Sequence, residues 1–354
     1  MSAKLRGCPL GPAVCLLMLW CLVSGCASPV PEVPPDARTP AERPISTPPS
    51  ESGAVAALEA SPRQGEWVEV DLPGSVDPIM AWVVRPDSNQ AAPVVLVVHE
   101  IFGLTDWVRA VADRLADNGF VAVAPDLLSG LGPDGGGTAA VPSRDGVVRL
   151  IRAIDTDDVV ARLSAVRAFA STLGETTGTV ATLGFCWGGS ASFAYALADP
   201  ELDAAVVFYG SSPEATEDYQ RVAAPVLGLY GGDDERVNAT VAEAEREMAQ
   251  YGKHFETATF AGAGHGFLRA QEDRQGANRV ASEQAWRRAV EFLRQHLLWS
   301  DQAYLNDTPM LSDKRVMRGD PGSVAVWASG LIAKRRRSSE NATPGCTNQR
   351  APPP

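Results

Sequence analysis

Apolar and polar positions follow two different periods in the middle of the chain. Residues 68–71 and 80–84 alternate approximately between apolar and polar side chains, the period of two expected for strands with one face in water. Residues 94–98 are apolar at every position, which is typical of a strand buried on both faces of a sheet. This region therefore predicts an N-terminal antiparallel hairpin followed by a parallel sheet.

Strand and helix patterns then alternate as far as residue 298. The further predicted strands are 120–124, 179–183, 203–209, 226–230 and 255–260, and the predicted helices include 108–115, 159–169, 190–197, 238–251 and 285–298. This alternation implies a mostly parallel, doubly wound sheet with helices on both faces. The expected fold class is α/β, with one domain over residues 63–298.

The N-terminus has the layout of a bacterial export signal, predicted over residues 1–25. Lys4 and Arg6 precede an apolar run that ends in Leu22-Val23-Ser24-Gly25-Cys26, which resembles a bacterial lipobox. The resemblance implies a lipid on Cys26 and an extracytoplasmic, membrane-anchored location in the cell envelope. The alternatives are an ordinary cleaved signal peptide or a short membrane anchor. The anchor is the weaker one, because the apolar run is shorter than the roughly 20 residues that a spanning helix needs.

Two segments flank the predicted domain. Residues 26–62 are rich in proline and serine and predict a semi-extended tether. Residues 299–354 lose hydrophobic periodicity and predict a disordered tail. The basic run 334–337 in that tail is interpreted as solvated, because the chain carries a net charge of −12. No nucleic-acid partner is expected, and the sequence leaves the oligomeric state open.

Cysteine usage singles out one thiol in the predicted domain. The chain has six cysteines, three of which precede Cys26 and would leave with the signal. Cys186 and Cys346 then remain as thiols, which excludes a disulfide framework and a cysteine-rich zinc site. We expect no metal and no cofactor. A lone thiol kept in an exported domain needs a reason, and catalysis is one.

The stretch 184–189, Gly-Phe-Cys-Trp-Gly-Gly, lies between a buried strand pattern and a helix pattern. A nucleophile on such a turn needs small residues two positions before and after it, here Gly184 and Gly188. The amide of Trp187 would then point at the reacting oxygen. The alternative is a buried, unreactive cysteine beside a glycine turn.

A base and an acid follow in the order nucleophile, acid, histidine. Asp233 and Asp234 come after one buried strand, with Asp234 preferred, although either could be a helix N-cap. His265 comes after the last strand and is flanked by glycines. His254 precedes a strand and His296 lies near the end of a helix, whereas His99 follows the first parallel strand and stays near the site.

Five motifs in the same order resemble those of dienelactone hydrolases. They are HEIFG (99–103), APDL (124–127), GFCWGG (184–189), GGDDERV (231–237) and AGHGFLR (263–269). The resemblance implies an α/β-hydrolase fold and a Cys186–His265–Asp234 triad. It also implies an oxyanion hole from the amides of Ile101 and Trp187.

The resemblance further implies that Glu100 keeps the resting thiol protonated. From the residues alone, a carboxylate just past a buried strand must find a partner, and backbone amides alone could satisfy it.

Two positions depart from that family's pattern. The family binds a substrate carboxylate with two arginines, of which Arg269 is present while Leu128-Ser129-Gly130 replaces the other. Phe208 stands where the family has a substrate-pocket tyrosine, with Tyr209 beside it. Hydrolysis of an ester or lactone through a thioester is the expected function, with dienelactone itself disfavoured.

The alternative from another class of function is a non-catalytic envelope binding protein on the same scaffold. Thiol redox chemistry is disfavoured, because the predicted domain has no resolving cysteine.

Overall fold

The structure is a computed structural model that describes residues 44–214 and 216–306. The predicted signal peptide, the predicted lipidation site Cys26 and residues 307–354 of the predicted tail lie outside the described residues. The chain separates into two units, residues 1–302 and 303–354, and the first contains the predicted domain.

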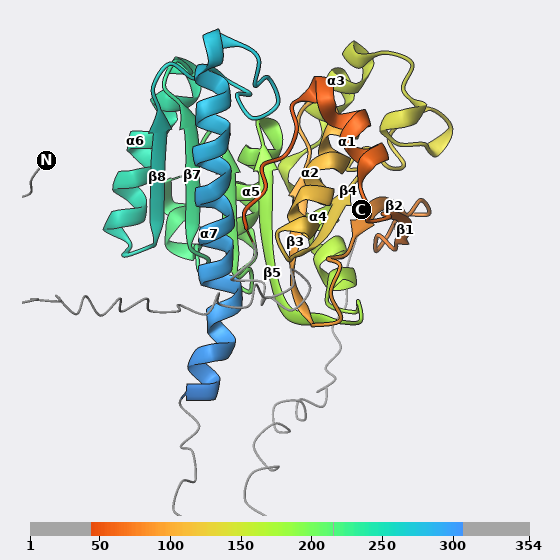
Figure 1. Ribbon diagram of the computed structural model, residues 1–354, viewed down its shortest axis with the longest axis horizontal. Coiled ribbons are helices and arrows are strands. Elements are labelled where there is room, and N and C mark those ends of the chain that lie inside the picture. The colour runs from red at the N-terminus through yellow and green to blue at the C-terminus, as the bar shows by residue number, and fades with distance from the viewer. Residues whose placement is uncertain (1–43, 215, 307–354) are drawn as a thin grey trace, which may run out of the picture. The chain divides into compact units, whose positions relative to one another are not determined.

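Within the described residues, eight strands form one sheet in the order β1-β2-β4-β3-β5-β6-β7-β8 (Figure 1). They are β1 (Glu66–Val70), β2 (Ile79–Val84), β3 (Ala92–Val98), β4 (Val121–Pro125), β5 (Thr176–Phe185), β6 (Ala204–Phe208), β7 (Val226–Gly231) and β8 (Phe255–Phe260). β2 pairs antiparallel with β1 and β4, and the other neighbours are parallel. The predicted hairpin and parallel sheet are confirmed.

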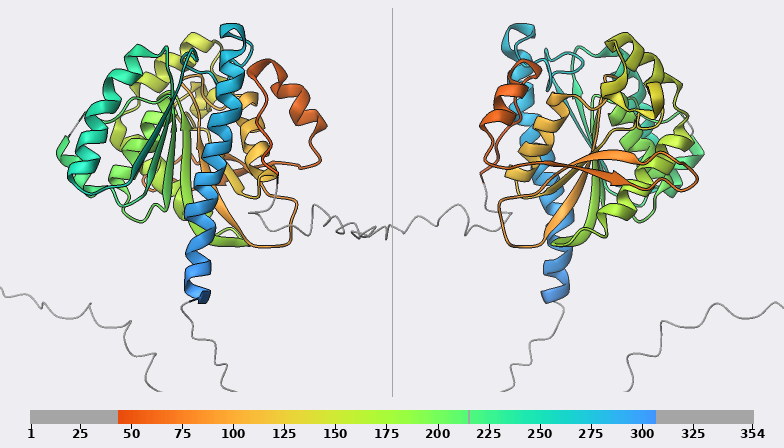
Figure 2. Two further views of the ribbon diagram at one scale, coloured as in Figure 1. Left: turned by 60° about the vertical axis from the view of Figure 1, so that its left-hand side comes forward. Right: turned by 90° about the vertical axis from the view of Figure 1, so that its right-hand side faces the viewer.

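Helices cover both faces of this sheet (Figure 2). One face packs against α2 (Asp106–Asp117) and α7 (Ala277–Asn306), and the other against α4 (Thr156–Ala170), α5 (Trp187–Ala198) and α6 (Glu235–Gln250). Along β3, the side chains of Val95 and Val97 pack in the core on the face covered by α2 and α7, and those of Val94 and Leu96 pack in the core on the opposite face. Both sets of side chains are buried, which explains why the sequence shows an unbroken apolar run there.

The predicted tether is wrong for its last part, because residues 44–60 pack on the domain. Asn118 donates to the carbonyl of Ser46 (3.0 Å), and Trp107 donates its indole N–H to the carbonyl of Pro49 (3.0 Å). A short helix, α1 (Ala54–Ala60), then packs on α2, as the red and orange end of the ribbon shows (Figure 1). A proline-rich segment lacks core side chains, but it offers main-chain carbonyls to buried donors, and composition does not reveal those contacts.

The last helix is longer than predicted at both ends. α7 begins at Ala277 rather than at residue 285 and continues to Asn306. Its first turns are largely polar, so their apolar periodicity is weak. α3 (Arg144–Ala153) lies in the long connection after β4, capped by the Ser143 hydroxyl. Among the helices of the described residues, none has the length and hydropathy that crossing a membrane requires.

Candidate active site

The turn between β5 and α5 holds Cys186 in a strained backbone conformation. Cys186 has φ 54° and ψ −116°, a region that residues with a side chain rarely adopt. Its amide donates to the carbonyl of Phe208 (3.0 Å), and its carbonyl accepts from Ser190 (3.1 Å). Strain of this kind persists only where the surroundings fix it, and here the neighbouring strand and the first turn of α5 do so.

The two glycines of the motif are required by close packing, as the sequence predicts. A Cβ on Gly184 would lie 1.9 Å from the carbonyl oxygen of Gly188. A Cβ on Gly188 would lie 2.3 Å from the carbonyl oxygens of Val98 and His99. Strand β5, its neighbour β3 and helix α5 can therefore meet at this point only without side chains at these positions.

The structure brings the three predicted triad residues together. His265 Nε2 lies 3.1 Å from Cys186 Sγ, and His265 Nδ1 lies 2.5 Å from Asp234 Oδ2. Asp234 also caps α6 by accepting from the Val237 amide (3.4 Å), so the same carboxylate contacts the imidazole and caps the helix. Asp233 instead forms an exposed ion pair with Arg274 (2.7 Å). The preference for Asp234 therefore agrees with the geometry.

Glu100 is a buried carboxylate that contacts Arg269 and whose charge acts on the thiol. Its side chain is 4% exposed, and Arg269 Nε donates to Oε2 at 2.7 Å. Burial raises the pKa of Glu100 to about 6, although the charge of Arg269 and a hydrogen bond from it act in the opposite direction. At neutral pH Glu100 is therefore mainly a carboxylate.

The resting sulfur is a protonated thiol at neutral pH. Burial raises the pKa of Cys186 to about 11, and the negative charge of Glu100 adds to that rise. The backbone amides of Trp187 and Ile101 donate to the sulfur and lower the pKa, but by less. The amides of both predicted oxyanion donors thus converge on Sγ.

His99 is a structural residue rather than a second base. It is fully buried, its Nε2 accepts from the Leu127 amide (3.2 Å), and its Nδ1 therefore donates to the carbonyl of Glu100 (2.8 Å). Burial lowers the pKa of His99, so the ring is neutral and fixed in one tautomer. It stacks on Trp187 with ring centroids 5.6 Å apart, which links the two segments that carry the oxyanion donors.

The predicted substrate contact of Phe208 is wrong. Its side chain is fully buried and packs in the core against Phe185, Phe267 and Trp286. Tyr209 is equally buried but contacts the site, since its ring lies edge-on to His265 (5.3 Å) and its hydroxyl interacts with Glu100. Burial and the Glu100 charge raise the pKa of Tyr209 well above its usual value.

Sequence reasoning missed two charged residues beside the site, Glu51 and Arg144. Glu51 forms ion pairs with Arg269 and with Arg144 (3.6 Å). Neither residue belongs to a recognisable motif, and both lie far in sequence from the triad. No local sequence signal could have identified them, because only the packing of residues 44–60 brings Glu51 to the site.

A cavity of about 480 Å³ adjoins the elbow. Apolar side chains of α4 and α5, which include Val159, Ala191 and Leu197, line part of it, and Trp187 and Ser190 of the elbow helix also belong to its lining. The lining also contains polar and charged residues, which include Asp157, Asp218 and Arg221. Cys186 does not line this cavity. The cavity therefore reaches the first turn of α5 without including the sulfur.

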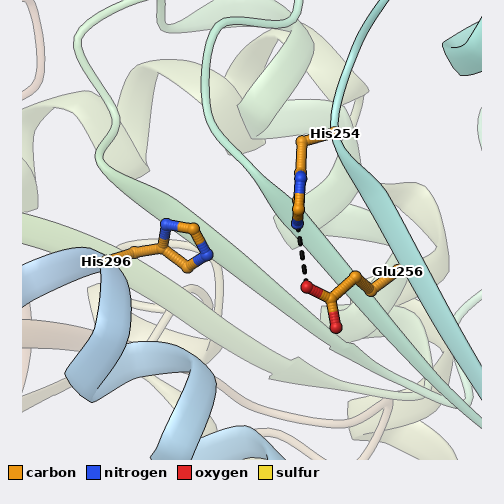
Figure 3. Close-up of side chains that lie close together, drawn as sticks. All are labelled: His254, Glu256 and His296. Carbon is orange, nitrogen blue, oxygen red and sulfur yellow. Dashed lines mark hydrogen bonds and ion pairs between the residues drawn. The ribbon is translucent and has the colours of Figure 1, made fainter.

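Among the described residues, one group has the composition of a metal site: His254, Glu256 and His296, whose donor atoms lie within 4.8 Å of one another (Figure 3). His254 Nε2 lies 2.9 Å from Glu256, and Arg288 donates to the second carboxylate oxygen (3.3 Å). The carboxylate is thus already matched by protein donors. The two residues His254 and Glu256 lie at the start of β8, whereas His265 follows the end of that strand, so the group is separate from the triad.

Comparisons with known proteins point to one family. The model of the "Dienelactone hydrolase family" matches residues 79–297, more than half of the 354-residue chain. A Salmonella typhimurium protein named "Putative carboxymethylenebutenolidase" is 33% identical over 236 residues, which cover 64% of this chain and 86% of that protein. A carboxymethylenebutenolidase of Pseudomonas putida is 31% identical over 216 residues, covering 60% of this chain and 89% of the other.

The fold likeness extends to solved structures. A crystal structure of a "Putative Dienelactone Hydrolase" from Klebsiella pneumoniae subsp. pneumoniae matches with a TM-score of 0.58 and 24% identity, covering 66% of this chain and all of the other. At that identity the match supports the α/β-hydrolase fold alone.

Proposed function

The chain belongs to the dienelactone hydrolase family and is a carboxylic ester or lactone hydrolase, and we propose that Cys186 is its nucleophile, acting through a thioester acyl-enzyme. The observation that carries the proposal is the line of contacts from Sγ to His265 Nε2 (3.1 Å) and from Nδ1 to Asp234 (2.5 Å), on a strained strand-to-helix turn. A nucleophile, a base and a group that orients the base are what covalent catalysis requires.

The acylation step uses the thiol as it rests in the site. Sγ attacks the carbonyl carbon while its proton passes to His265 Nε2, and the carbonyl oxygen becomes an oxyanion. The amides of Ile101 and Trp187 donate to that oxyanion, and they are already aimed at the sulfur in the resting state. Collapse expels the alkoxide, which takes the proton from His265 and leaves a thioester on Cys186.

Deacylation returns the enzyme to its starting state. Water attacks the thioester while His265 takes one of its protons, and Asp234 stabilises the imidazolium that forms. The second tetrahedral intermediate expels the Cys186 thiolate, which recovers the proton as the carboxylic acid leaves. These steps use only protein groups and water.

Glu100 provides the control of the thiol in this scheme. A carboxylate near the sulfur disfavours the thiolate, and the thiolate is the form that reacts with oxidants and electrophiles. The resting protein therefore keeps its thiol protonated, and proton transfer to His265 takes place once a substrate is bound.

Trapping of the acyl-enzyme tests this function. The full chain is mixed with p-nitrophenyl butyrate, quenched in acid and analysed by peptide mass spectrometry. We expect one butyryl group on the peptide that contains Cys186, and we expect prior alkylation with iodoacetamide to abolish both the adduct and the release of p-nitrophenol. Turnover that persists after verified alkylation of Cys186 would refute the proposed nucleophile.

We also propose that a lipid on Cys26 anchors the domain at the envelope, facing the periplasm. The lipobox-like sequence is the only support for this location. In bacterial cells, Cys26→Ser is expected to move the protein out of the membrane fraction and to abolish incorporation of a labelled fatty acid. Cys21→Ser, inside the predicted signal, should retain both. Equal labelling of the two variants would contradict the anchor.

A further inference from the structure

Glu51 places its carboxylate between two arginines beside the catalytic centre. It begins the short 3₁₀ turn η3 (Glu51–Gly53) that precedes α1. Arg269 Nη1 donates to one carboxylate oxygen, and Arg144 Nη2 lies 3.6 Å from the other. These three side chains come from the N-terminal segment, the loop after His265 and the first turn of α3, so the fold rather than a local motif brings them together.

The N-terminal segment is fixed at this point by several contacts to the same loop. The Glu51 amide donates to the Arg269 carbonyl (2.9 Å), and the Ser50 hydroxyl donates to Glu272 (2.5 Å). The Gln271 side-chain amide donates to the carbonyl of Pro48 (3.0 Å). Main-chain and side-chain bonds at Glu51 and at the residues before it therefore hold this segment in place before any ligand arrives.

The two guanidinium groups share an aromatic support next to the reacting groups. Arg144 lies over the ring of Phe102 at 3.6 Å from its centroid, and Arg269 lies at 5.2 Å from the same ring. Phe102 follows Glu100 and Ile101 directly, and Arg269 also donates to Glu100 (2.7 Å). Arg269 thus contacts the thiol-controlling carboxylate directly, and both arginines contact Phe102, the residue that follows the oxyanion donor Ile101.

Two guanidinium groups that converge in this way form a site for a carboxylate. The site is open to solvent, since the Arg144 and Glu51 side chains are 54% and 41% exposed. A substrate carboxylate could bind there only by displacing the Glu51 carboxylate, or by binding beside it at the cost of repulsion between the two negative charges.

We infer that Glu51 is a specificity-determining residue: it fills the anion site of Arg269 and Arg144 from within the chain, so that the enzyme favours uncharged esters or lactones over substrates that carry a carboxylate. The inference rests on the proposed function. Arg144, from the start of α3, supplies the second guanidinium of this site, and Leu128-Ser129-Gly130 supplies none. The cation pair is complete, but its ligand is part of the protein.

The test compares two esters that differ in one charge, p-nitrophenyl butyrate and the mono-p-nitrophenyl ester of glutaric acid. In Glu51→Gln, the ratio of kcat/KM for the anionic ester to that for the neutral ester is expected to rise at least about tenfold over the wild-type ratio. The rise should shrink at high salt, because the site is exposed. A merely structural role of Glu51 would move neither readout.

Two further variants sharpen the comparison. Glu59→Gln removes one charge from the exposed side of α1 and should keep the wild-type ratio, since the Glu59 side chain is exposed and is not one of the side chains that contact Arg269 or Arg144. Adding Arg144→Gln to Glu51→Gln should cancel the gain, because one cation of the site is then lost. Thermal unfolding of each variant verifies that it is folded.

The outcomes separate this inference from the proposed function. If the wild type hydrolyses the neutral ester and Glu51→Gln leaves the ratio unchanged, the inference is overturned and the function stands. If no variant hydrolyses either ester, the proposed function fails. Calorimetric measurement of glutarate binding to the wild type and to Glu51→Gln then tests the role of Glu51. Binding at least about tenfold tighter to Glu51→Gln than to the wild type would support the anion site, and equal binding would overturn it.

Discussion

Replacing Cys186 with alanine is expected to lower kcat/KM for p-nitrophenyl butyrate by about 10³-fold or more, because residues of a triad act as a unit and none of the others can form the acyl-enzyme. Cys186 is the one free cysteine among the described residues. Its sulfur is the atom on which His265 Nε2 and the two backbone amides converge. Steady-state release of p-nitrophenol measures the loss.

Two control variants make this result specific. Cys346→Ser removes the other thiol that remains after the predicted signal is cleaved, and its activity should match the wild type. Cys186→Ser keeps a hydrogen-bonding nucleophile on the same turn, and any remaining turnover should no longer respond to iodoacetamide. If the Cys186→Ala variant has a kcat/KM within about tenfold of the wild type and an unchanged unfolding temperature, the thioester route is excluded.

The elbow and the triad could be predicted from the sequence because their determinants are local or topological. Gly184 and Gly188 are fixed by the close approach of backbone atoms, and that requirement appears as residue identities at fixed spacing. Asp234 and His265 follow parallel strands, and the carboxyl ends of such strands meet at one edge of the sheet. Strand order along the chain was therefore enough to place them near Cys186.

The sequence-based predictions were wrong or incomplete where a contact depends on tertiary packing, which the periodicity of apolar residues does not reveal. Phe208 and Tyr209 are adjacent at the end of β6, and the sequence does not show which of them turns toward the triad. The structure gives Tyr209 a φ of 41°, and this irregular backbone directs its ring to His265 while Phe208 stays in the core. Glu51 was missed for a related reason, since its segment is held by main-chain carbonyls and has no apolar signature.

Replacing Glu100 with glutamine is expected to accelerate alkylation of Cys186 by iodoacetamide by about tenfold above pH 6, because the variant lacks a negative charge that disfavours the thiolate. Glutamine keeps a hydrogen-bond acceptor for Arg269. The pseudo-first-order rate, read from the modified Cys186 peptide by mass spectrometry, reports the thiolate fraction directly. Iodoacetamide is neutral, so the rate does not depend on attraction of the reagent.

The pH dependence identifies the charge as the cause. The pKa of Glu100 is about 6, so above that pH the wild type carries the carboxylate that raises the thiol pKa, and below it the carboxyl is protonated. The wild-type and Glu100→Gln rates should therefore diverge as pH rises through 6 and converge below it. Asp233→Asn removes an exposed charge paired with Arg274 and should follow the wild type throughout. Superimposable profiles of wild type and Glu100→Gln above pH 6 would show that Glu100 does not control the thiol.

The same variant separates the two causes of the high thiol pKa. Burial is the larger cause of the rise to about 11, and Glu100→Gln leaves it in place. The pKa of the variant should therefore fall but stay above the ordinary cysteine value of 9.0, so that the thiol remains mainly protonated at neutral pH. Attack of the Cys186 thiol on an ester would still require transfer of the thiol proton to His265. His265→Ala should therefore abolish turnover in the Glu100→Gln background as well. Turnover that survived the loss of His265 would mean that removing one charge had produced a free thiolate, and that the imidazole is not the base.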